Sequence, residues 1–236
     1  MIMIYVTGDL HGEIDSDKLD EIHFPQGKNL TRDDYVIICG DFGYVLDEGP
    51  GDQQGQRMLE EKPWTTLFID GNHENFDLLA TYPIETWHGG KIQRIQPHVL
   101  HPMRGSYYTL EGQTLFVFGG ASSTDKMFRK AHTSWWAEEM PNKKEYQEGL
   151  ANLAMHHNKV DYILTHTGPT AYVLDLCEGD DYRKEELTEF FGDLDAHISF
   201  KHWYFGHFHF DHTFDHVHTV LYRSVIPLGS KIEIKE

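Results

Sequence analysis

Cysteine and long apolar segments are scarce in this sequence. Cys39 and Cys177 are the two cysteines among 236 residues, which excludes a disulfide framework and favours the reducing cytoplasm. Cys39 follows the apolar run 35–38, so we expect a small buried side chain there rather than redox chemistry. No segment approaches the roughly 20 apolar residues that a membrane-spanning helix needs. The opening residues, MIMIYVTGD, lack the basic leader and the apolar length of a secretory signal peptide.

Basic residues are also scarce, with 20 lysines and arginines against 38 acidic residues and a net charge of −18. Affinity for nucleic acid depends mainly on cationic side chains that neutralise phosphates. The charge balance therefore disfavours long nucleic acid as a partner. A small anionic substrate remains compatible with it, provided that bound cations make the site itself positive.

Histidine, by contrast, is abundant, with 17 residues in the chain. Imidazole is the commonest metal-binding side chain, although the same abundance makes chance histidine motifs easier to find. The positions of the histidines relative to the predicted strands therefore decide which of them are candidate ligands.

Short apolar runs alternate with helical patterns along the chain. We predict strands, buried on both faces, at residues 2–7, 35–40, 66–70, 114–118, 162–165 and 202–205. Helices are predicted at residues 51–61, 143–158 and 185–195. In the second helix, Asn142 is the expected cap, and Leu150, Leu153 and Ala154 form the expected apolar face. This alternation predicts a layered α/β fold, and the lack of a linker predicts a single domain over residues 1–236.

One segment departs from the alternation. Residues 120–142 form a long excursion with little periodicity, two tryptophans, Trp135 and Trp136, and several basic residues. Long loops in compact domains are often functional. The tryptophan pair is compatible with packing as well as with a platform on which a substrate stacks.

Five segments place metal-binding side chains just after a predicted strand. They read G-D-L-H-G from residue 8, G-D-F-G from residue 40, G-N-H-E from residue 71, T-H-T from residue 165 and G-H-F-H from residue 206. The carboxyl ends of strands in an open α/β sheet converge on one edge, where the following loops build the site. These segments supply seven candidate ligands: Asp9, His11, Asp41, Asn72, His166, His207 and His209.

Seven side chains are more than one ion can use. The set therefore predicts two divalent cations about 3.5–4 Å apart that share a carboxylate. Oxygen and imidazole donors without a thiolate suit manganese, iron or zinc, and they disfavour calcium and a structural zinc site.

The ordered set of motifs resembles the calcineurin-like metallophosphoesterase superfamily, and the resemblance extends from Asp9 to His209. D-x-H or G-D alone is unspecific, whereas all five motifs in order, each after a strand, form a specific signature. The resemblance implies a four-layer calcineurin-like β-sandwich flanked by helices. It also implies a dinuclear metal-dependent phosphoesterase that hydrolyses phosphodiesters or phosphomonoesters of a small or nucleotide-like substrate by attack of a metal-bridged hydroxide.

The same resemblance implies a role for each matching residue. One metal would be held by Asp9, His11, Asp41 and His209, and the other by Asp41, Asn72, His166 and His207. His73 would be the catalytic residue that stabilises or protonates the leaving oxygen, and Glu74 is a candidate for orienting it.

The second motif departs from one branch of the superfamily. Protein Ser/Thr phosphatases carry G-D-x-V-D-R-G there, whereas this chain reads GDFGYVL, with Tyr44 and Val45 in place of the aspartate and the arginine. Protein phosphatase activity is therefore in doubt, and the missing arginine favours diesters over monoesters. The candidate substrate-binding residues that could replace it are Arg104, Lys126 and Arg129.

Three functions are compatible with these observations. The leading one is hydrolysis of a small or nucleotide-like phosphoester, and the second is a nuclease on short single-stranded nucleic acid. The third is a metal-bound scaffold that binds a protein partner without catalysis. The trailing histidines His212, His216 and His218 fit a polar strand face or hairpin better than a further metal site.

Overall fold

Two β-sheets pack face to face in the computed structural model, which describes residues 2–177 and 185–232. The first sheet has seven strands in the order β13-β1-β2-β3-β6-β5-β4. Their bounds are β1 Ile4–Thr7, β2 Tyr35–Ile38, β3 Thr65–Phe68, β4 Ile84–Trp87, β5 Gly90–Gln96, β6 Val99–Pro102 and β13 Ile226–Pro227. Strands β1, β2, β3 and β6 run parallel to one another, whereas β13, β5 and β4 pair antiparallel with their neighbours.

The second sheet has six strands in the order β11-β12-β10-β9-β8-β7. Their bounds are β7 Ser106–Leu110, β8 Gln113–Phe118, β9 Tyr162–Thr165, β10 His202–Phe205, β11 His212–Thr213 and β12 His218–Val220. The four central strands β8, β9, β10 and β12 are parallel. Each sheet thus contains a parallel core with antiparallel strands at its edges.

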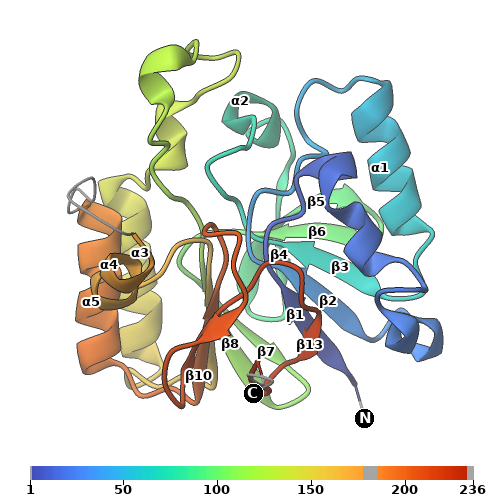
Figure 1. Ribbon diagram of the computed structural model, residues 1–236. Coiled ribbons are helices and arrows are strands. Elements are labelled where there is room, and N and C mark those ends of the chain that lie inside the picture. The colour runs from blue at the N-terminus through green and yellow to red at the C-terminus, as the bar shows by residue number, and fades with distance from the viewer. Residues whose placement is uncertain (1, 178–184, 233–236) are drawn as a thin grey trace.

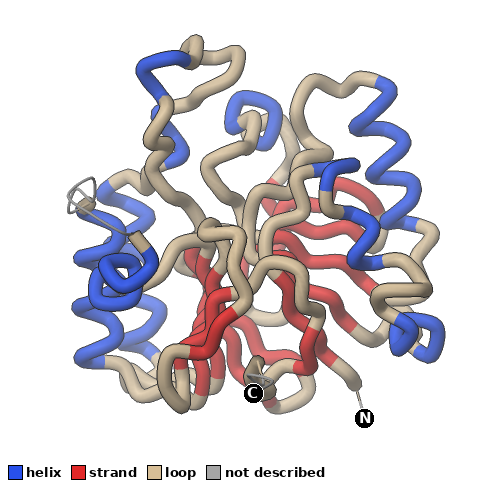
Figure 2. Tube along the Cα trace, viewed as in Figure 1, coloured by secondary structure: helices blue, strands red, loops and turns tan. Residues whose placement is uncertain are grey.

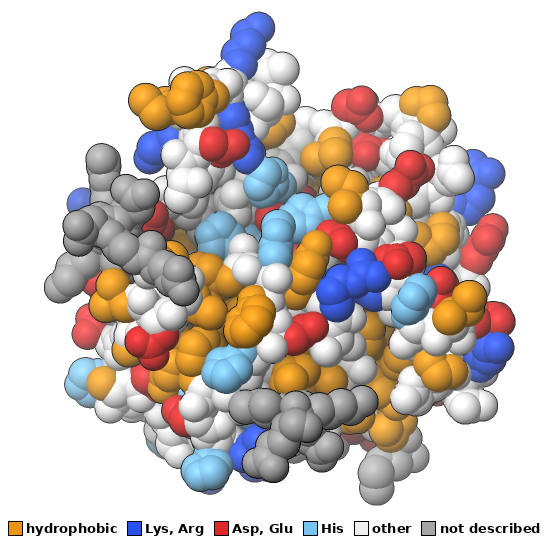
Figure 3. Space-filling view, in the orientation of Figure 1, with side chains coloured by type: hydrophobic (Ala, Val, Ile, Leu, Met, Phe, Trp, Pro, Cys, Tyr) orange, Lys and Arg blue, Asp and Glu red, His pale blue; other side chains and the backbone are white. Residues whose placement is uncertain are grey.

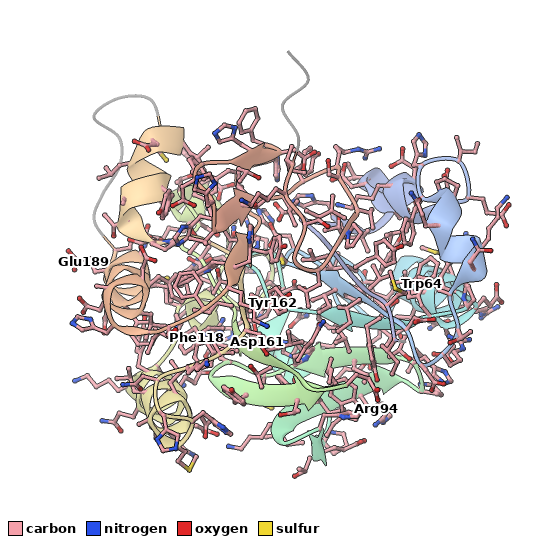
Figure 4. All side chains as sticks on the ribbon, turned by 90° about the horizontal axis from the view of Figure 1, so that it is seen from below. Trp64, Arg94, Phe118, Asp161, Tyr162 and Glu189 are labelled. Atoms are coloured by element: carbon pink, nitrogen blue, oxygen red, sulfur yellow. The ribbon has the colours of Figure 1, made fainter. Side chains whose placement is uncertain are left out.

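Helices cover the outer face of each sheet, which gives four layers (Figures 1 and 2). The helices are α1 Pro50–Glu60, α2 Phe76–Leu79, α3 Lys143–Met155, α4 Thr170–Leu176 and α5 Glu186–His197. Side chains alternate between the layers along each strand. In β1, for example, Val6 packs between the two sheets, whereas Tyr5 packs on the outer side with Trp64. Figure 4 labels Trp64 on that outer side and Tyr162 in the interior between the sheets.

The predicted strands and helices are confirmed to within about two residues at most ends, together with the layered α/β fold and a single domain for the described residues. The capping box of α3 at Asn142 is also present. The expected apolar face of α3 is wrong in part, because Leu150 is 48% exposed and Ala154 is exposed. The buried stripe runs through Tyr146, Gly149 and Leu153, since α3 packs with Gly149 directly against the backbone of Gly105.

The excursion at residues 120–142 projects above the rest of the molecule (Figure 1). It contains two short 3-10 turns, Lys126–Phe128 and Ala137–Glu139. Its first residues follow the carboxyl end of β8, so it leaves the domain at the same edge as the loops after β9 and β10. None of the helices in the described ranges has the length and apolar character to cross a bilayer.

Candidate metal centre

The loops after five parallel strands meet at one edge of the two sheets. β1, β2 and β3 contribute from the first sheet, and β9 and β10 contribute from the second. Because parallel neighbours end at the same edge, side chains distant in sequence come together there. Figure 3 shows histidines gathered in the middle of this face, below the basic side chains of the excursion.

The structure brings together all seven predicted ligands. Two groups have ligand atoms that all lie within 4.8 Å of one another: Asp9, His11 and His209, and Asp41, His166 and His207. The seventh, Asn72, belongs with the second group, because its Oδ1 lies 3.1 Å from Nε2 of His166.

Asp41 stands between the two groups. Its Oδ2 lies 3.3 Å from Nε2 of His11, and its Oδ1 lies 3.4 Å from Nε2 of His166. The backbone N–H of His73 also donates to Oδ1, over 2.9 Å. One carboxylate oxygen therefore faces each group, which is the arrangement that a bridging ligand requires.

The carboxylate of Asp9 tests whether this site suits a cation. Its Oδ1 accepts a hydrogen bond from the backbone N–H of His207, over 2.8 Å. Its Oδ2 is buried, accepts no hydrogen bond from any described residue, and lies 3.2 Å from Nε2 of His209. A buried carboxylate oxygen without a donor is destabilising, and a bound cation would satisfy it. The donor set and this unsatisfied oxygen both fit a divalent metal.

Hydrogen bonds on the far side of the imidazoles orient two of the candidate ligands. Nδ1 of His166 donates to the carbonyl of Cys39 over 2.8 Å, and Nδ1 of His11 lies 2.8 Å from a carboxylate oxygen of Asp15. In each ring Nε2 is left to face the site. Metal-binding histidines are commonly held in this way, which fixes both the ring and its tautomer.

Burial and neighbouring charges together set the pKa values of these groups. Burial alone would lower the pKa of His11, but the adjacent Asp41 and then Asp15 raise it to about 9. Burial, reinforced by the neighbouring His166, lowers the pKa of His207 to about 4. The surrounding imidazoles outweigh the effect of burial on Asp41 and hold its pKa far below the usual range. Protons and cations compete for such ligands, so metal affinity will depend on pH.

The backbone is strained at several of these positions. His11, Asp41, His207 and His209 have φ values of 48°, 47°, 74° and 51°, in the left-handed region that side chains rarely adopt. The glycines of the motifs permit close approach. A Cβ at Gly71 would lie 2.0 Å from a carboxylate oxygen of Asp41. The left-handed backbone at these residues and the close approach that Gly71 permits thus bring the candidate ligands together.

His73 lies beside the ligands and is exposed. Its ring meets the ring of His11 edge to face, with centroids 5.9 Å apart. Nη1 and Nη2 of Arg129 each lie 3.2 Å from a ring nitrogen of His73, and Asp125 holds Arg129 through Nε over 2.8 Å. Partial desolvation, together with the charge of Arg129, lowers the pKa of His73 despite the opposing charge of Asp41. Arg129 is therefore the substrate-binding candidate that contacts the predicted catalytic residue.

The other two substrate-binding candidates lie in different surroundings. Arg104 is buried, and its Nε donates to Asp70 over 2.7 Å while Nη2 donates to the carbonyls of Glu138 and Glu139. Its guanidinium is thus engaged inside the protein, which corrects the expectation of a free phosphate contact. Lys126 is exposed on the first turn of the excursion.

Glu74 links the second motif to the third. Its buried carboxylate accepts the backbone N–H of Phe42 over 2.8 Å and that of Gly71 over 3.3 Å. Burial, reinforced by the charge of Asp41, raises the pKa of Glu74 to about 8. Glu74 therefore holds together the loops that carry Asp41 and Asn72, rather than contacting His73 directly.

Packing accounts for Trp136 and for two of the trailing histidines. Trp136 is buried and its indole N–H donates to Asp77 over 2.8 Å, which is a packing role. His212 and His218 lie in the antiparallel pair β11–β12, so the predicted hairpin is confirmed. The buried His218 bridges Asp195, 3.0 Å from Nε2, and Asp215, 3.1 Å from Nδ1.

Sequence reasoning missed one residue that supports the site, Lys18. Lys18 is buried, and its ammonium donates to the carbonyls of Gly8, Asp9 and Tyr222. It thereby anchors the loop that carries Asp9. A lysine in the segment between the first two predicted strands has no local pattern that would distinguish it from a solvated one.

Comparisons with known proteins identify a family and two similar proteins. The family model of the calcineurin-like phosphoesterases matches residues 2–211. Lariat debranching enzyme A of Xenopus laevis is 24% identical over 241 aligned residues, which cover 87% of this chain and 42% of that protein. The chain thus spans less than half the length of this relative. A solved structure, phosphopantetheinyl hydrolase from Mycobacterium tuberculosis, is similar with a TM-score of 0.42 and 16% identity, over 94% of this chain and 90% of that one.

Proposed function

Because the chain belongs to the calcineurin-like phosphoesterase family, which consists of metal-dependent hydrolases, we propose that it is a dinuclear phosphodiesterase on a small or nucleotide-like substrate. One observation carries the proposal: two groups of ligand atoms are joined by Asp41, with one carboxylate oxygen toward each group. The unsatisfied Oδ2 of Asp9 supports it, because a cation would supply the missing partner.

The proposed division of labour follows from the placement of the side chains. Asp9, His11, Asp41 and His209 would hold one cation, and Asp41, Asn72, His166 and His207 would hold the other. When bound, the two cations would lower the pKa of a water molecule and neutralise phosphate charge. His73, which lies beside the ligand set, would donate a proton to the leaving oxygen.

Arg129 would bind the phosphate in place of the arginine that the second motif lacks. Its guanidinium lies against the His73 ring, and Asp125 holds it there. A guanidinium recognises phosphate oxygens through paired hydrogen bonds. A diester has one negative charge on the attacked phosphate and needs less cationic neutralisation than a monoester, so it suits better a site whose second motif lacks the arginine.

A second candidate function has one observation in its favour, the similarity to a lariat debranching enzyme. A nuclease of this kind would act on short or branched nucleic acid, since the net charge of −18 opposes long tracts of phosphate contacts. Cleavage of a short oligonucleotide that falls steeply with added salt would favour it over a small-molecule enzyme. Manganese as the native metal and a cytoplasmic location remain predictions under either function.

The test is hydrolysis of p-nitrophenyl phosphate and bis(p-nitrophenyl) phosphate by metal-stripped protein reloaded with Mn²⁺. We expect metal-dependent turnover, faster on the diester, that is lost in Asp41→Asn. The matched control is Asp193→Asn, which removes the same charge from an exposed position on α5 and should retain full activity. Protein that binds two metals but cleaves neither ester would contradict the proposal.

A further inference from the structure

Asn72 is the one predicted ligand whose donor atom depends on the direction of an amide. Only its Oδ1 can bind a cation, whereas the other end of the amide is a hydrogen-bond donor. In the structure Oδ1 faces His166 at 3.1 Å, and Nδ2 donates to Oγ of Ser123 over 3.2 Å. The partner of Nδ2 therefore determines which end of the amide reaches the metal centre.

Ser123 is itself oriented by a buried carboxylate. Its backbone N–H donates to Oε1 of Glu139 over 2.9 Å, and its hydroxyl donates to Oε2 over 2.6 Å. Asn72, Ser123 and Glu139 are all buried, at 5%, 3% and 1% exposure. Water is thus a poor substitute for any member of this chain of hydrogen bonds.

The carboxylate of Glu139 sets the donor–acceptor direction of these hydrogen bonds. A carboxylate only accepts hydrogen bonds, so the single hydroxyl proton of Ser123 must point to Glu139. Oγ of Ser123 can then only accept from Asn72, which requires the NH₂ end of that amide. We propose that Glu139 is a positioning residue that acts through Ser123 to hold Oδ1 of Asn72 toward the metal centre.

The hydrogen bonds between Ser123 and Glu139 also connect the two ends of the excursion. Ser123 lies near the start of the excursion, and Glu139 ends its second 3-10 turn. Their two hydrogen bonds close the base of the excursion, which also carries Arg129. The same carboxylate therefore connects a predicted metal ligand with the segment that would bind the phosphate.

The test exploits an isosteric substitution. In Glu139→Gln, the side-chain oxygen must still accept the backbone N–H of Ser123, so the amide NH₂ faces the Ser123 hydroxyl and donates to it. The hydroxyl proton is then free to donate to Asn72, and the Asn72 amide is no longer held in one direction. Ser123→Ala removes the acceptor entirely. Glu138→Gln is the matched control, because it removes the same charge from the adjacent, exposed position.

The inference rests on the proposed dinuclear centre, so the readout is metal binding rather than turnover. Mn²⁺ is titrated calorimetrically into metal-stripped wild type and each variant, and the free energy of unfolding is measured alongside. We expect two binding steps in the wild type and in Glu138→Gln. In Glu139→Gln and Ser123→Ala one step should weaken about 10- to 100-fold while the other is retained.

Two results would overturn the inference: unchanged affinity for both ions in Glu139→Gln and Ser123→Ala, or equal weakening of both steps, which would indicate general loosening. A wild type that binds two Mn²⁺ ions without cleaving either ester would contradict the proposed function alone. The Mn²⁺ affinities of the variants would still test whether Glu139 positions Asn72. A wild type that binds no Mn²⁺ would overturn both.

Discussion

Buried carboxylates in this protein differ in what satisfies them. Asp70 is buried and is met by Arg104 over 2.7 Å and by His101 over 3.2 Å, which together outweigh burial and hold its pKa well below the usual range. Asp9 is equally buried, yet its Oδ2 accepts no hydrogen bond from the described residues. The first pattern is that of a structural ion pair. The second fits a ligand for a cation because imidazoles of the candidate metal site lie beside Asp9. Glu74 also has a carboxylate oxygen without a partner in the described part of the chain, but its other oxygen is held by backbone N–H groups.

Arg104 should therefore matter for stability. Arg104→Met leaves the carboxylate of Asp70 buried without its main partner, and breaking a buried pair in this way costs about 3–5 kcal/mol. We expect the free energy of unfolding, measured by urea denaturation, to fall by roughly that amount.

Arg94 offers a matched control for this substitution. It extends from β5 (Figure 4) and pairs with Glu85 over 2.9 Å, with both side chains more than a third exposed. Exposed pairs contribute about 0–1 kcal/mol, so Arg94→Met should change stability little. Equal effects of the two substitutions would refute the structural role of Arg104.

His73 should matter for turnover and not for metal binding. His73→Ala removes a side chain that lies beside the ligand set, so both cations should still bind. Loss of general acid catalysis should slow hydrolysis about 10²- to 10⁴-fold for an alkyl ester, and less for a p-nitrophenyl ester, whose leaving group needs no proton. Steady-state kinetics on the two esters measures this difference. The exposed His216→Ala is the control, and an unchanged rate on the alkyl ester in His73→Ala would remove His73 from the mechanism.

At the scale of the elements, β10 leads into the loop that carries His207 and His209, and it begins with a buried histidine whose protonation depends on pH. His202 begins this strand, is buried, and lies 2.8 Å through Nε2 from the hydroxyl of Thr219 in β12. Burial, with a further contribution from the charge of His218, lowers the pKa of His202 from 6.5 to about 4. The folded state therefore keeps His202 neutral at pH values where the unfolded chain would protonate it.

This difference predicts how stability depends on pH. As pH falls below about 6.5, His202 binds a proton in the unfolded state but stays neutral in the folded state. The free energy of unfolding therefore decreases until about pH 4. Above pH 6.5 the contribution is fully present. We expect the loss in unfolding free energy between pH 7 and pH 5 to be smaller in His202→Gln, whose amide still reaches Thr219. Equal losses in wild type and variant would contradict the assignment.

At the scale of the whole molecule, the candidate metal centre lies between the two sheets. Asp9, His11, Asp41 and Asn72 follow strands of the first sheet, and His166, His207 and His209 follow strands of the second. Bound cations would therefore cross-link the two inner layers at one edge. Ligands that bind only the folded state stabilise it by an amount that grows with the logarithm of their free concentration.

Metal binding should thus raise the stability of the whole domain. At a free Mn²⁺ concentration of 100 times Kd, the unfolding free energy should rise by about 2.7 kcal/mol per ion. Thermal unfolding followed by circular dichroism, with and without Mn²⁺, measures this as a higher Tm that EDTA reverses. Asp41→Asn should lose most of the increase, and a Tm in the wild type that does not respond to Mn²⁺ would contradict a metal site between the sheets.

The strands and the order of the candidate ligands follow from the amino-acid sequence. Apolar runs such as 35–38 are buried on both faces, so their composition reports their environment directly. Each candidate ligand lies within about four residues of such a strand, and parallel strands end at a common edge. The convergence of seven side chains was therefore predictable.

The surroundings of several other side chains depend on contacts between elements that are distant in the sequence. Arg104 reads as a candidate phosphate contact in the sequence, but Asp70, distant in the chain, pairs with it. Leu150 fits the helical pattern, yet the approach of Gly149 to Gly105 rotates the buried stripe away from it. Glu139 belongs to an exposed-looking acidic run and is buried because the base of the excursion closes over it. Such contacts arise between elements, and local composition carries no signal for them.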